Sequence, residues 1–313
     1  MKEIGGYFGL EELRSREYYP DLVAVNNARN ALLYILKAKH IKKLYIPYFL
    51  CDTVYRLCER EGVLYEFYHI DENFNPLFDK RIGNGEALYI VNYYGQITNE
   101  RVLKKKYGNI IFDNVQAFFR KPRKGIDTVY SCRKFFGVPD GGYAASDCRL
   151  DEELPNDVSM NRMKHILGRY EAGTASDYYA DFSENDESFY NLELRSMSKL
   201  THNILGAIDY ASVKRKREEN FAELSKLLKN ENLLKLRLPE GPYAYPFLCK
   251  DGEKIRKALV SKKIYVPTLW RGVDGSPTEI EYAVNILPLP CDQRYGKEDM
   301  LRIAEEIKNA RKS

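Results

Sequence analysis

Short apolar runs alternate with helical stretches along the first 131 residues. Residues 28–39 combine good helix formers with apolar side chains at helical spacing, and Asn26 and Asn27 before them are natural N-cap residues. A second helix is expected over residues 52–60, ending near Gly62. Strands are expected at residues 44–46, 64–68, 88–91, 110–112 and 129–131. This alternation predicts an α/β fold whose sheet is mostly parallel and buried.

The pattern changes after residue 150. Residues 150–192 are acidic and polar with no clear strand, so loops and helices are expected, with a mobile stretch at 183–186. Residues 198–231 predict one long helix, or two helices broken near Gly206. Strands are then expected at 245–248, 264–266 and 286–289, and helices at 253–262 and from about 297. We therefore predict a large domain over residues 1–210 and a small α+β domain over residues 211–313.

Polar residues directly follow three of the predicted strands. They are Asn92, Asp113 and Ser131, with Lys134 just beyond. Ligands of parallel α/β sheets bind at the carboxyl ends of the strands. We therefore expect a ligand site at this edge of the sheet.

Composition and charge narrow the class of protein. The 49 Lys and Arg against 45 Asp and Glu leave a net charge of +4, which does not indicate a nucleic-acid partner. The densest basic stretch, 214–217, runs directly into two glutamates and is interpreted as a solvated helix face. No stretch is apolar enough to span a membrane, and the first residues lack a secretory core. We expect a cytoplasmic protein.

Cysteine and histidine usage argues against a metal enzyme. The six cysteines form no CxxC pair, and we expect them to be reduced. The four histidines form no HxH or HExxH pattern. The chain also has no dinucleotide fingerprint, Walker sequence or nucleophile elbow. We therefore predict that the chain has no metal site.

Lys134 is the leading candidate for chemistry. It is followed by two aromatic residues and by a Gly- and Pro-containing turn, F-F-G-V-P-D-G-G. The glycines allow the backbone to approach a ligand closely. A lysine enclosed by aromatic groups has its ammonium form disfavoured, which frees the amine for Schiff-base chemistry. The alternative is a solvated surface charge, the usual state of a loop lysine.

Asp113 and its neighbours form the second candidate group. A carboxylate at the end of an Ile-Ile-Phe strand is either the acidic partner of a pyridoxal phosphate (PLP) ring nitrogen or the N-cap of a following helix. Gln116 can hydrogen-bond the phenolic oxygen of the same cofactor. The start of the helix near Arg29 offers an anion site, and Ser131 offers a hydroxyl. Arg29 is equally well explained as an ordinary first-turn surface residue.

Taken in order, these segments resemble a known family. They read N-A-R-N-A-L, P-Y-F-L-C, Y-Y-G-Q, F-D-N-V-Q-A, Y-S-C-R-K-F-F-G-V-P-D-G-G and, near the end, L-P-L-P-C-D-Q-R-Y-G. The set is similar to the DegT/DnrJ/EryC1/StrS family of PLP-dependent sugar aminotransferases. The resemblance runs over most of the chain. It implies the fold type I architecture and bound pyridoxal 5'-phosphate.

The resemblance assigns roles position by position. Lys134 matches the Schiff-base lysine, Asp113 the partner of the pyridine nitrogen, and Gln116 the neighbour of the phenolic oxygen. The phosphate contacts and the position of the ring-stacking residue also carry over. The phosphate contacts match Ala28, Arg29 and Ser131, and the stacking residue falls near Tyr48 or Phe49.

The resemblance also implies an activity and an assembly. The expected reaction transfers an amino group, from glutamate, to a keto group of a nucleotide-linked sugar, in polysaccharide biosynthesis. Arg195 matches a segment that approaches the partner subunit's active site, so a homodimer is expected. The alternatives are a PLP-dependent sugar dehydratase or lyase, and a non-catalytic regulatory protein on the same scaffold. Lys134 argues against the first, and the intact Lys134, Asp113 and Gln116 set against the second.

Overall fold

An eight-stranded mixed sheet forms the centre of the larger part of the molecule. The computed structural model describes residues 8–13, 16–270 and 272–312. The strand order is β1-β8-β7-β6-β5-β2-β3-β4. The strands are β1 Val23–Val25, β2 Lys43–Pro47, β3 Leu64–Ile70, β4 Pro76–Leu77, β5 Glu86–Val91, β6 Ile110–Asp113, β7 Asp127–Ser131 and β8 Gly142–Ala145. Neighbouring strands from β3 to β7 pair in parallel, whereas β8 is antiparallel to both β7 and β1.

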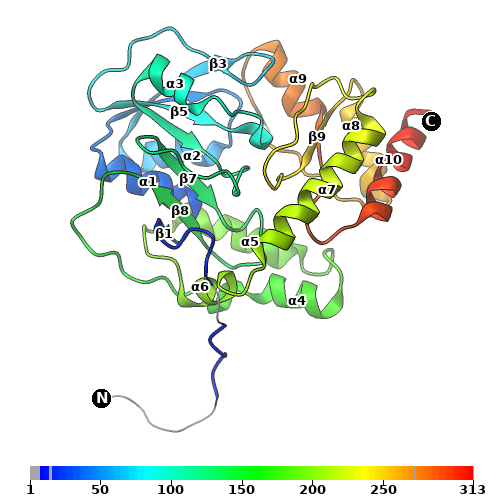
Figure 1. Ribbon diagram of the computed structural model, residues 1–313, viewed down its shortest axis with the longest axis horizontal. Coiled ribbons are helices and arrows are strands. Elements are labelled where there is room, and N and C mark those ends of the chain that lie inside the picture. The colour runs from blue at the N-terminus through cyan, green and yellow to red at the C-terminus, as the bar shows by residue number, and fades with distance from the viewer. Residues whose placement is uncertain (1–7, 14–15, 271, 313) are drawn as a thin grey trace.

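Three helices connect the parallel strands and cover the sheet. They are α1 Ala28–Ala38, α2 Asp52–Glu61 and α3 Glu100–Tyr107 (Figure 1). Asn27 caps α1, since its side chain accepts a hydrogen bond from the N–H of Asn30. Helix α1 packs against β7 and β8. Strands β6, β7 and β8 are buried at every position, and their central residues are mostly apolar.

The C-terminal part has its own small antiparallel pair, β9 Tyr245–Leu248 and β10 Ile286–Leu289. The helices around it are α7 Tyr210–Leu228, α8 Gly252–Ser261, α9 Pro277–Asn285 and α10 Lys297–Lys312 (Figure 1). A second apolar cluster fills this part. It includes Phe221, Leu224, Phe247, Leu287 and Ile303. Between the two parts of the chain lie α4 Lys164–Ala172, α5 Tyr179–Ser188 and α6 Lys199–Leu205, together with short 3-10 turns.

Most of the predicted elements are confirmed, and the errors have physical causes. Gly206 separates α6 from α7, so the two-helix interpretation is correct. The strand expected at 264–266 is wrong, because this segment pairs with no other strand within the described ranges and Tyr265 is 50% exposed. The stretch at 183–186 lies inside α5. Helix α9 was missed although Ser276 and Glu279 form a capping box at its start, a signal visible in the sequence.

The interpretation of residues 214–217 as one solvated helix face is also wrong. Arg217 is only 2% exposed, although Arg215 beside it is largely exposed. The Arg217 guanidinium donates from Nη1 to the carbonyl of Pro242 at 2.9 Å and from Nη2 to the carbonyl of Phe135 at 3.0 Å. Its Nε donates to Gln293 Oε1 at 2.7 Å. Arg217 therefore joins α7 to the loop that carries Lys134.

Candidate active site

Two parallel strands bring the predicted polar residues to one edge of the sheet. Asp113 ends β6 and Ser131 ends β7, and Asp113 is in register with Val129 two residues before Ser131. The N–H of Asn92, which follows β5, donates to the carbonyl of Asp113 at 2.9 Å. The expectation that these residues share the carboxyl edge of the sheet is confirmed.

The carboxylate of Asp113 is buried and held by two donors. It is 8% exposed. Oδ2 accepts a hydrogen bond from the hydroxyl of Tyr89 at 2.7 Å, and Oδ1 accepts from the N–H of Val115 at 2.7 Å. Burial raises the pKa of Asp113, against the two hydrogen bonds and the charge of Lys134, which act to lower it. Turns follow Asp113, so its interpretation as a helix N-cap is wrong.

Lys134 faces the same site but is not enclosed by its neighbours in sequence. Its side chain is exposed, and Nζ lies 5.6 Å from the centre of the Tyr243 ring. Phe135 and Phe136 are buried in an apolar cluster against which Tyr243 also packs, whereas Lys134 is exposed, so the expectation that its aromatic neighbours enclose it is wrong. The aromatic partner is Tyr243, which sequence reasoning missed because it lies 109 positions away, just before β9. A ring face attracts an ammonium group.

Gln116 presents a buried donor that has no acceptor among the described residues. Its side chain is 3% exposed, and Oε1 accepts a hydrogen bond from the N–H of Tyr94 at 2.8 Å. Nε2 is buried without a hydrogen-bond partner among the described residues. An unpartnered buried donor costs roughly 1–3 kcal/mol, so a ligand oxygen that accepts from it binds at an advantage. A phenolic oxygen fits this requirement.

The start of α1 lies against the glycine-rich segment. Gly142 is opposite Ser131 on one side and Val25 on the other. A Cβ on Gly142 would lie 2.6 Å from the carbonyl carbon of Asn27 and 2.7 Å from the nitrogen of Ala28. This close approach brings Ser131 beside the first turn of α1, whose N–H groups have no helical acceptor. Ala28, at the helix start, and Ser131 together form a candidate anion site.

The side chain of Arg29 is not an ordinary surface residue. Nη1 donates to the carbonyl of Phe189 at 2.5 Å, and the guanidinium lies 4.7 Å from the centre of the Tyr190 ring. Nε is buried without a partner among the described residues. Burial lowers the pKa of Arg29. A half-buried cation with one buried donor lacking a partner among the described residues supports an anion site at this helix start.

The two residues proposed for ring stacking already have aromatic partners. The Tyr48 ring stacks on Phe67 at 4.7 Å and on His69 at 4.6 Å. Phe49 is fully buried, with its ring 4.4 Å from that of Trp270. Neither contact places these rings beside Asp113. The stacking role of Tyr48 or Phe49 stays a prediction.

Cys51 is a site neighbour that the sequence did not indicate. It lies just before α2 and is half-buried. Cys51 interacts electrostatically with both Tyr89 and Arg29, so it lies near the tyrosine that bonds Asp113 and near the start of α1.

Arg195 is close to the helix start through its backbone. Its carbonyl accepts a hydrogen bond from the N–H of Asn26 at 3.0 Å. Its side chain forms an ion pair with Glu193 at 2.9 Å and is 40% exposed. Within one chain, the guanidinium has no contact with Asp113, Gln116 or Lys134.

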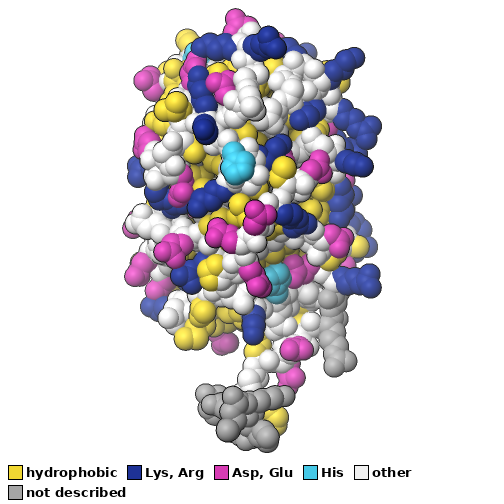
Figure 2. Space-filling view, turned by 90° about the vertical axis from the view of Figure 1, so that its left-hand side faces the viewer, with side chains coloured by type: hydrophobic (Ala, Val, Ile, Leu, Met, Phe, Trp, Pro, Cys, Tyr) yellow, Lys and Arg dark blue, Asp and Glu magenta, His cyan; other side chains and the backbone are white. Residues whose placement is uncertain are grey.

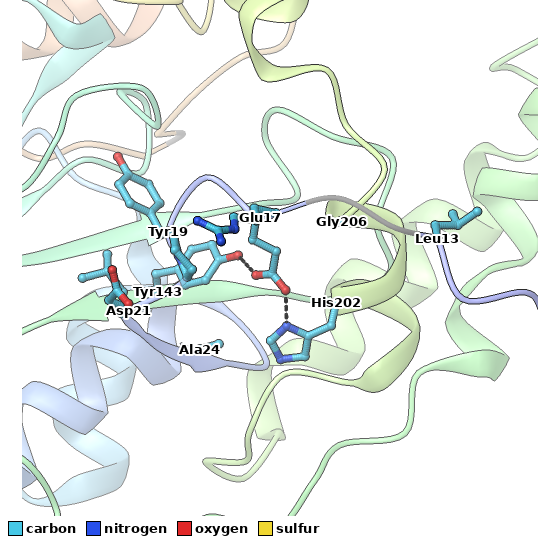
Figure 3. A pocket seen from close by; sticks show the side chains of 11 residues that line it. Leu13, Glu17, Tyr19, Asp21, Ala24, Tyr143, His202 and Gly206 are labelled. Atoms are coloured by element: carbon cyan, nitrogen blue, oxygen red, sulfur yellow. Dashed lines mark hydrogen bonds and ion pairs between the residues drawn. The ribbon is translucent and has the colours of Figure 1, made fainter.

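A cavity of about 660 Å³ lies apart from this site (Figure 3). Residues of the N-terminal segment line it together with Tyr143 and His202, and Glu17 lies between these two side chains. Glu17 accepts a hydrogen bond from the Tyr143 hydroxyl and lies 2.5 Å from His202 Nδ1. None of the predicted site residues lines this cavity.

Other kinds of site find no support in the described ranges. No group of three or more His, Cys, Asp or Glu residues there is arranged to hold a metal ion. All six cysteines are unpaired. Among the helices that the structure describes, none is long and apolar enough to span a membrane. Basic and acidic side chains are mixed on the face shown in Figure 2.

Comparison with known proteins identifies the fold. No protein-family model matches the chain, and no curated protein matches it. The chain is similar to a putative sugar aminotransferase, Spr1654 from Streptococcus pneumoniae, with a TM-score of 0.65, 15% identity, and coverage of 92% of this chain and 85% of that one. DesV from S. venezuelae, solved with a ketimine intermediate, gives a TM-score of 0.64, 17% identity, and coverage of 95% and 85%.

A DegT DnrJ EryC1 StrS aminotransferase from Brucella abortus gives a TM-score of 0.62 and 14% identity, with coverage of 92% and 85%. At these identities the likeness concerns the fold. The α/β architecture expected from the sequence is therefore confirmed, and the chain has the fold of the DegT DnrJ EryC1 StrS aminotransferase structures.

Proposed function

We propose that this chain is a PLP-dependent sugar aminotransferase with Lys134 as its Schiff-base lysine. The observation that carries the proposal is the buried Gln116 Nε2, a donor without a partner among the described residues, three positions after the buried carboxylate of Asp113. Both residues belong to the edge of the sheet that Lys134 faces. The structures of similar fold include a PLP-form and a PMP-form of the Streptococcus pneumoniae protein.

The residues present fit the cofactor at each of its polar ends. Asp113 would accept a hydrogen bond from a protonated ring nitrogen, and Gln116 would donate to the phenolic oxygen. The α1 start at Ala28 and Arg29, together with Ser131, would hold the phosphate. When bound, PLP supplies a carbonyl carbon for the amine and a ring that withdraws electrons.

Lys134 then acts on protons. Its amine would hold the cofactor through a covalent bond. As a free amine, Lys134 would move a proton between the donor carbon and the cofactor carbon, first as a base and then as an acid. Tyr243 lies beside Lys134, with its ring centre 5.6 Å from Nζ. The negative charge of Asp113 would stabilise a protonated ring nitrogen.

The proposed acceptor is the keto group of a nucleotide-linked sugar, and the proposed donor is glutamate. The sugar class is supported by the proteins of similar fold, which are described as sugar aminotransferases. The nucleotide, the donor and a place in polysaccharide biosynthesis in the cytoplasm rest on the resemblance of the sequence motifs. A screen of nucleotide keto-sugars with glutamate, read by mass spectrometry, tests these finer assignments.

We propose that two copies of the chain form the active unit. Helix α4 has no buried residue in one chain. The α4–α5 region exposes large apolar side chains, namely Leu167, Tyr170, Tyr179 and Phe182. A second copy on this face would bury them and would bring groups such as Arg195 near a neighbouring site. Light scattering should show a dimer, and a monomer with full transaminase activity would contradict this assembly.

We also propose that the large domain covers residues 1–210 and the small domain residues 211–313.

The cofactor bond gives the decisive test. Borohydride reduction of the protein with PLP should attach the cofactor covalently to Lys134, as found by peptide mapping. Lys134→Arg keeps the positive charge and should show no attachment. A label on another lysine would show that Lys134 is not the residue that binds the cofactor. A protein that stays colourless with added PLP would favour the non-catalytic alternative.

A further inference from the structure

We propose that Tyr89 is a positioning residue that holds the carboxylate of Asp113 ionised and fixed in orientation at the edge of the sheet. The inference rests on the proposed function, in which that carboxylate faces the cofactor ring. Tyr89 lies in the middle of β5, and its hydroxyl is 2.7 Å from Asp113 Oδ2. No other hydroxyl among the described residues bonds this carboxylate.

The sheet register explains why Tyr89 reaches Asp113. Strands β5 and β6 are parallel, with Tyr89 in register with Ile111 and Val91 in register with Asp113. Side chains two positions apart on a strand point to the same face, so Tyr89 and Asp113 lie on one face, one diagonal step apart. A tyrosine is long enough to span this diagonal. A shorter side chain at position 89 would leave Oδ2 without its donor.

The Tyr89 hydroxyl acts as the donor in its hydrogen bond with Asp113. Tyr89 is 2% exposed, and burial, followed by the nearby charge of Asp113, raises the pKa of Tyr89 well above its usual value. The phenol therefore stays protonated and donates to the carboxylate. A donor to an ionised carboxylate favours the charged form, which opposes the effect of burial on Asp113. Without Tyr89, burial would leave Asp113 more readily protonated.

The two donors also fix the carboxylate plane. Tyr89 reaches Oδ2 from β5, and the Val115 N–H reaches Oδ1 from the turn after β6. An ionised carboxylate has about four acceptor positions, so two of them remain for another donor. The other titratable groups that interact with Asp113 are Lys134, which lowers its pKa, and Tyr93, whose own pKa Asp113 raises. Neither Lys134 nor Tyr93 is hydrogen-bonded to Asp113, whereas Tyr89 is.

Tyr89→Phe tests the proposal, because it removes the hydroxyl and keeps the ring. Tyr68→Phe is a matched control: Tyr68 is equally buried, and its hydroxyl donates to the backbone carbonyl of Tyr89 at 2.8 Å, away from Asp113. The first measurement is the affinity for PLP as a function of pH. Binding requires an ionised Asp113, so affinity falls as pH falls through the pKa of that carboxyl.

In Tyr89→Phe the pH at which PLP affinity falls should move upward. Near that midpoint PLP should bind about tenfold more weakly than to the wild type, the effect of losing one charge-assisted hydrogen bond. Tyr68→Phe should lose stability but keep the wild-type midpoint. Equal midpoints in Tyr89→Phe and the wild type would overturn the proposal. So would an equal upward shift in Tyr68→Phe.

A second measurement does not depend on the cofactor. Infrared titration of the PLP-free chain follows the band of the protonated Asp113 carboxyl, assigned by its absence in Asp113→Asn. This band should appear at higher pH in Tyr89→Phe than in the wild type, and an unchanged titration would refute the role of Tyr89. If the wild type binds no PLP while the infrared shift is present, the proposed function fails and the control of Asp113 by Tyr89 stands.

Discussion

Replacing Gly142 by alanine adds a single methyl group and tests the proposed phosphate site. In Gly142→Ala, the new Cβ would meet the carbonyl carbon and oxygen of Asn27 and the nitrogen of Ala28, at 2.6, 2.7 and 2.7 Å. These are backbone atoms at the start of α1 and cannot rotate away as a side chain would. Ordinary contact begins at 3.4 Å, so the helix start must move by about 0.8 Å from β8.

Two effects should follow from this displacement. Overpacking of a close contact costs about 1–3 kcal/mol. For a chain of 313 residues this lowers Tm by roughly 2–5 °C. The helix-start N–H groups would also move relative to Ser131. Loss of one charge-assisted hydrogen bond to phosphate, about 1.5–3 kcal/mol, corresponds to ~10- to 100-fold weaker PLP binding.

The assay pairs a melting curve with a PLP titration by absorbance. Gly137→Ala is the control, since Gly137 lies in the same segment, has no positive φ, and its new Cβ would be 3.7 Å from Ile166 Cγ2. The control should keep the wild-type Tm and PLP affinity. If Gly142→Ala has the Tm of the wild type and binds PLP equally well, the helix start does not need its close approach to β8. If Gly142→Ala is destabilised but binds PLP normally, the phosphate lies elsewhere.

Three further predictions follow from other contacts. In Asp113→Asn, single-turnover transfer from glutamate should slow ~10- to 100-fold; a wild-type rate would remove Asp113 from the cofactor site. Arg217→Met should lower the free energy of unfolding in urea by about 2–4 kcal/mol, since buried carbonyl oxygens lose their donor, while Arg215→Met, at an exposed position, should change it little. The hydrogen bond to Glu17 raises the pKa of His202. The contribution of this hydrogen bond to the free energy of unfolding is therefore fully present below about pH 6.5. It is lost as pH rises through the folded-state pKa of His202. The difference in unfolding free energy between wild type and His202→Gln should accordingly be larger at acid pH, by at most ~1 kcal/mol because the histidine is partly exposed; a pH-independent difference would contradict this.

Local sequence determined most of the secondary structure. The apolar runs at β2, β5, β6 and β7 and the periodic pattern of α1 are strong signals, because a buried parallel sheet requires continuous apolar strands. Strand order then placed Asp113 and Ser131 at one edge, which parallel pairing makes predictable. The strands β1 and β8 were missed. They pair with each other, and Gly142 of β8 lies against the start of α1, a contact that no local pattern reveals.

The sequence by itself therefore determined the α/β class, the helices and strands with strong patterns, and which polar residues end the parallel strands. Only the tertiary structure decided the partners of those residues. The contacts of Tyr89 with Asp113 and of Tyr243 with Lys134 depend on long-range packing. So does the lack of an acceptor for Gln116 Nε2 in the part of the chain that the structure describes. So does the burial of Arg217 within a run of basic residues. The physical reason is that periodicity reports which face of one element is apolar, whereas a hydrogen-bond partner is chosen by how separate elements pack.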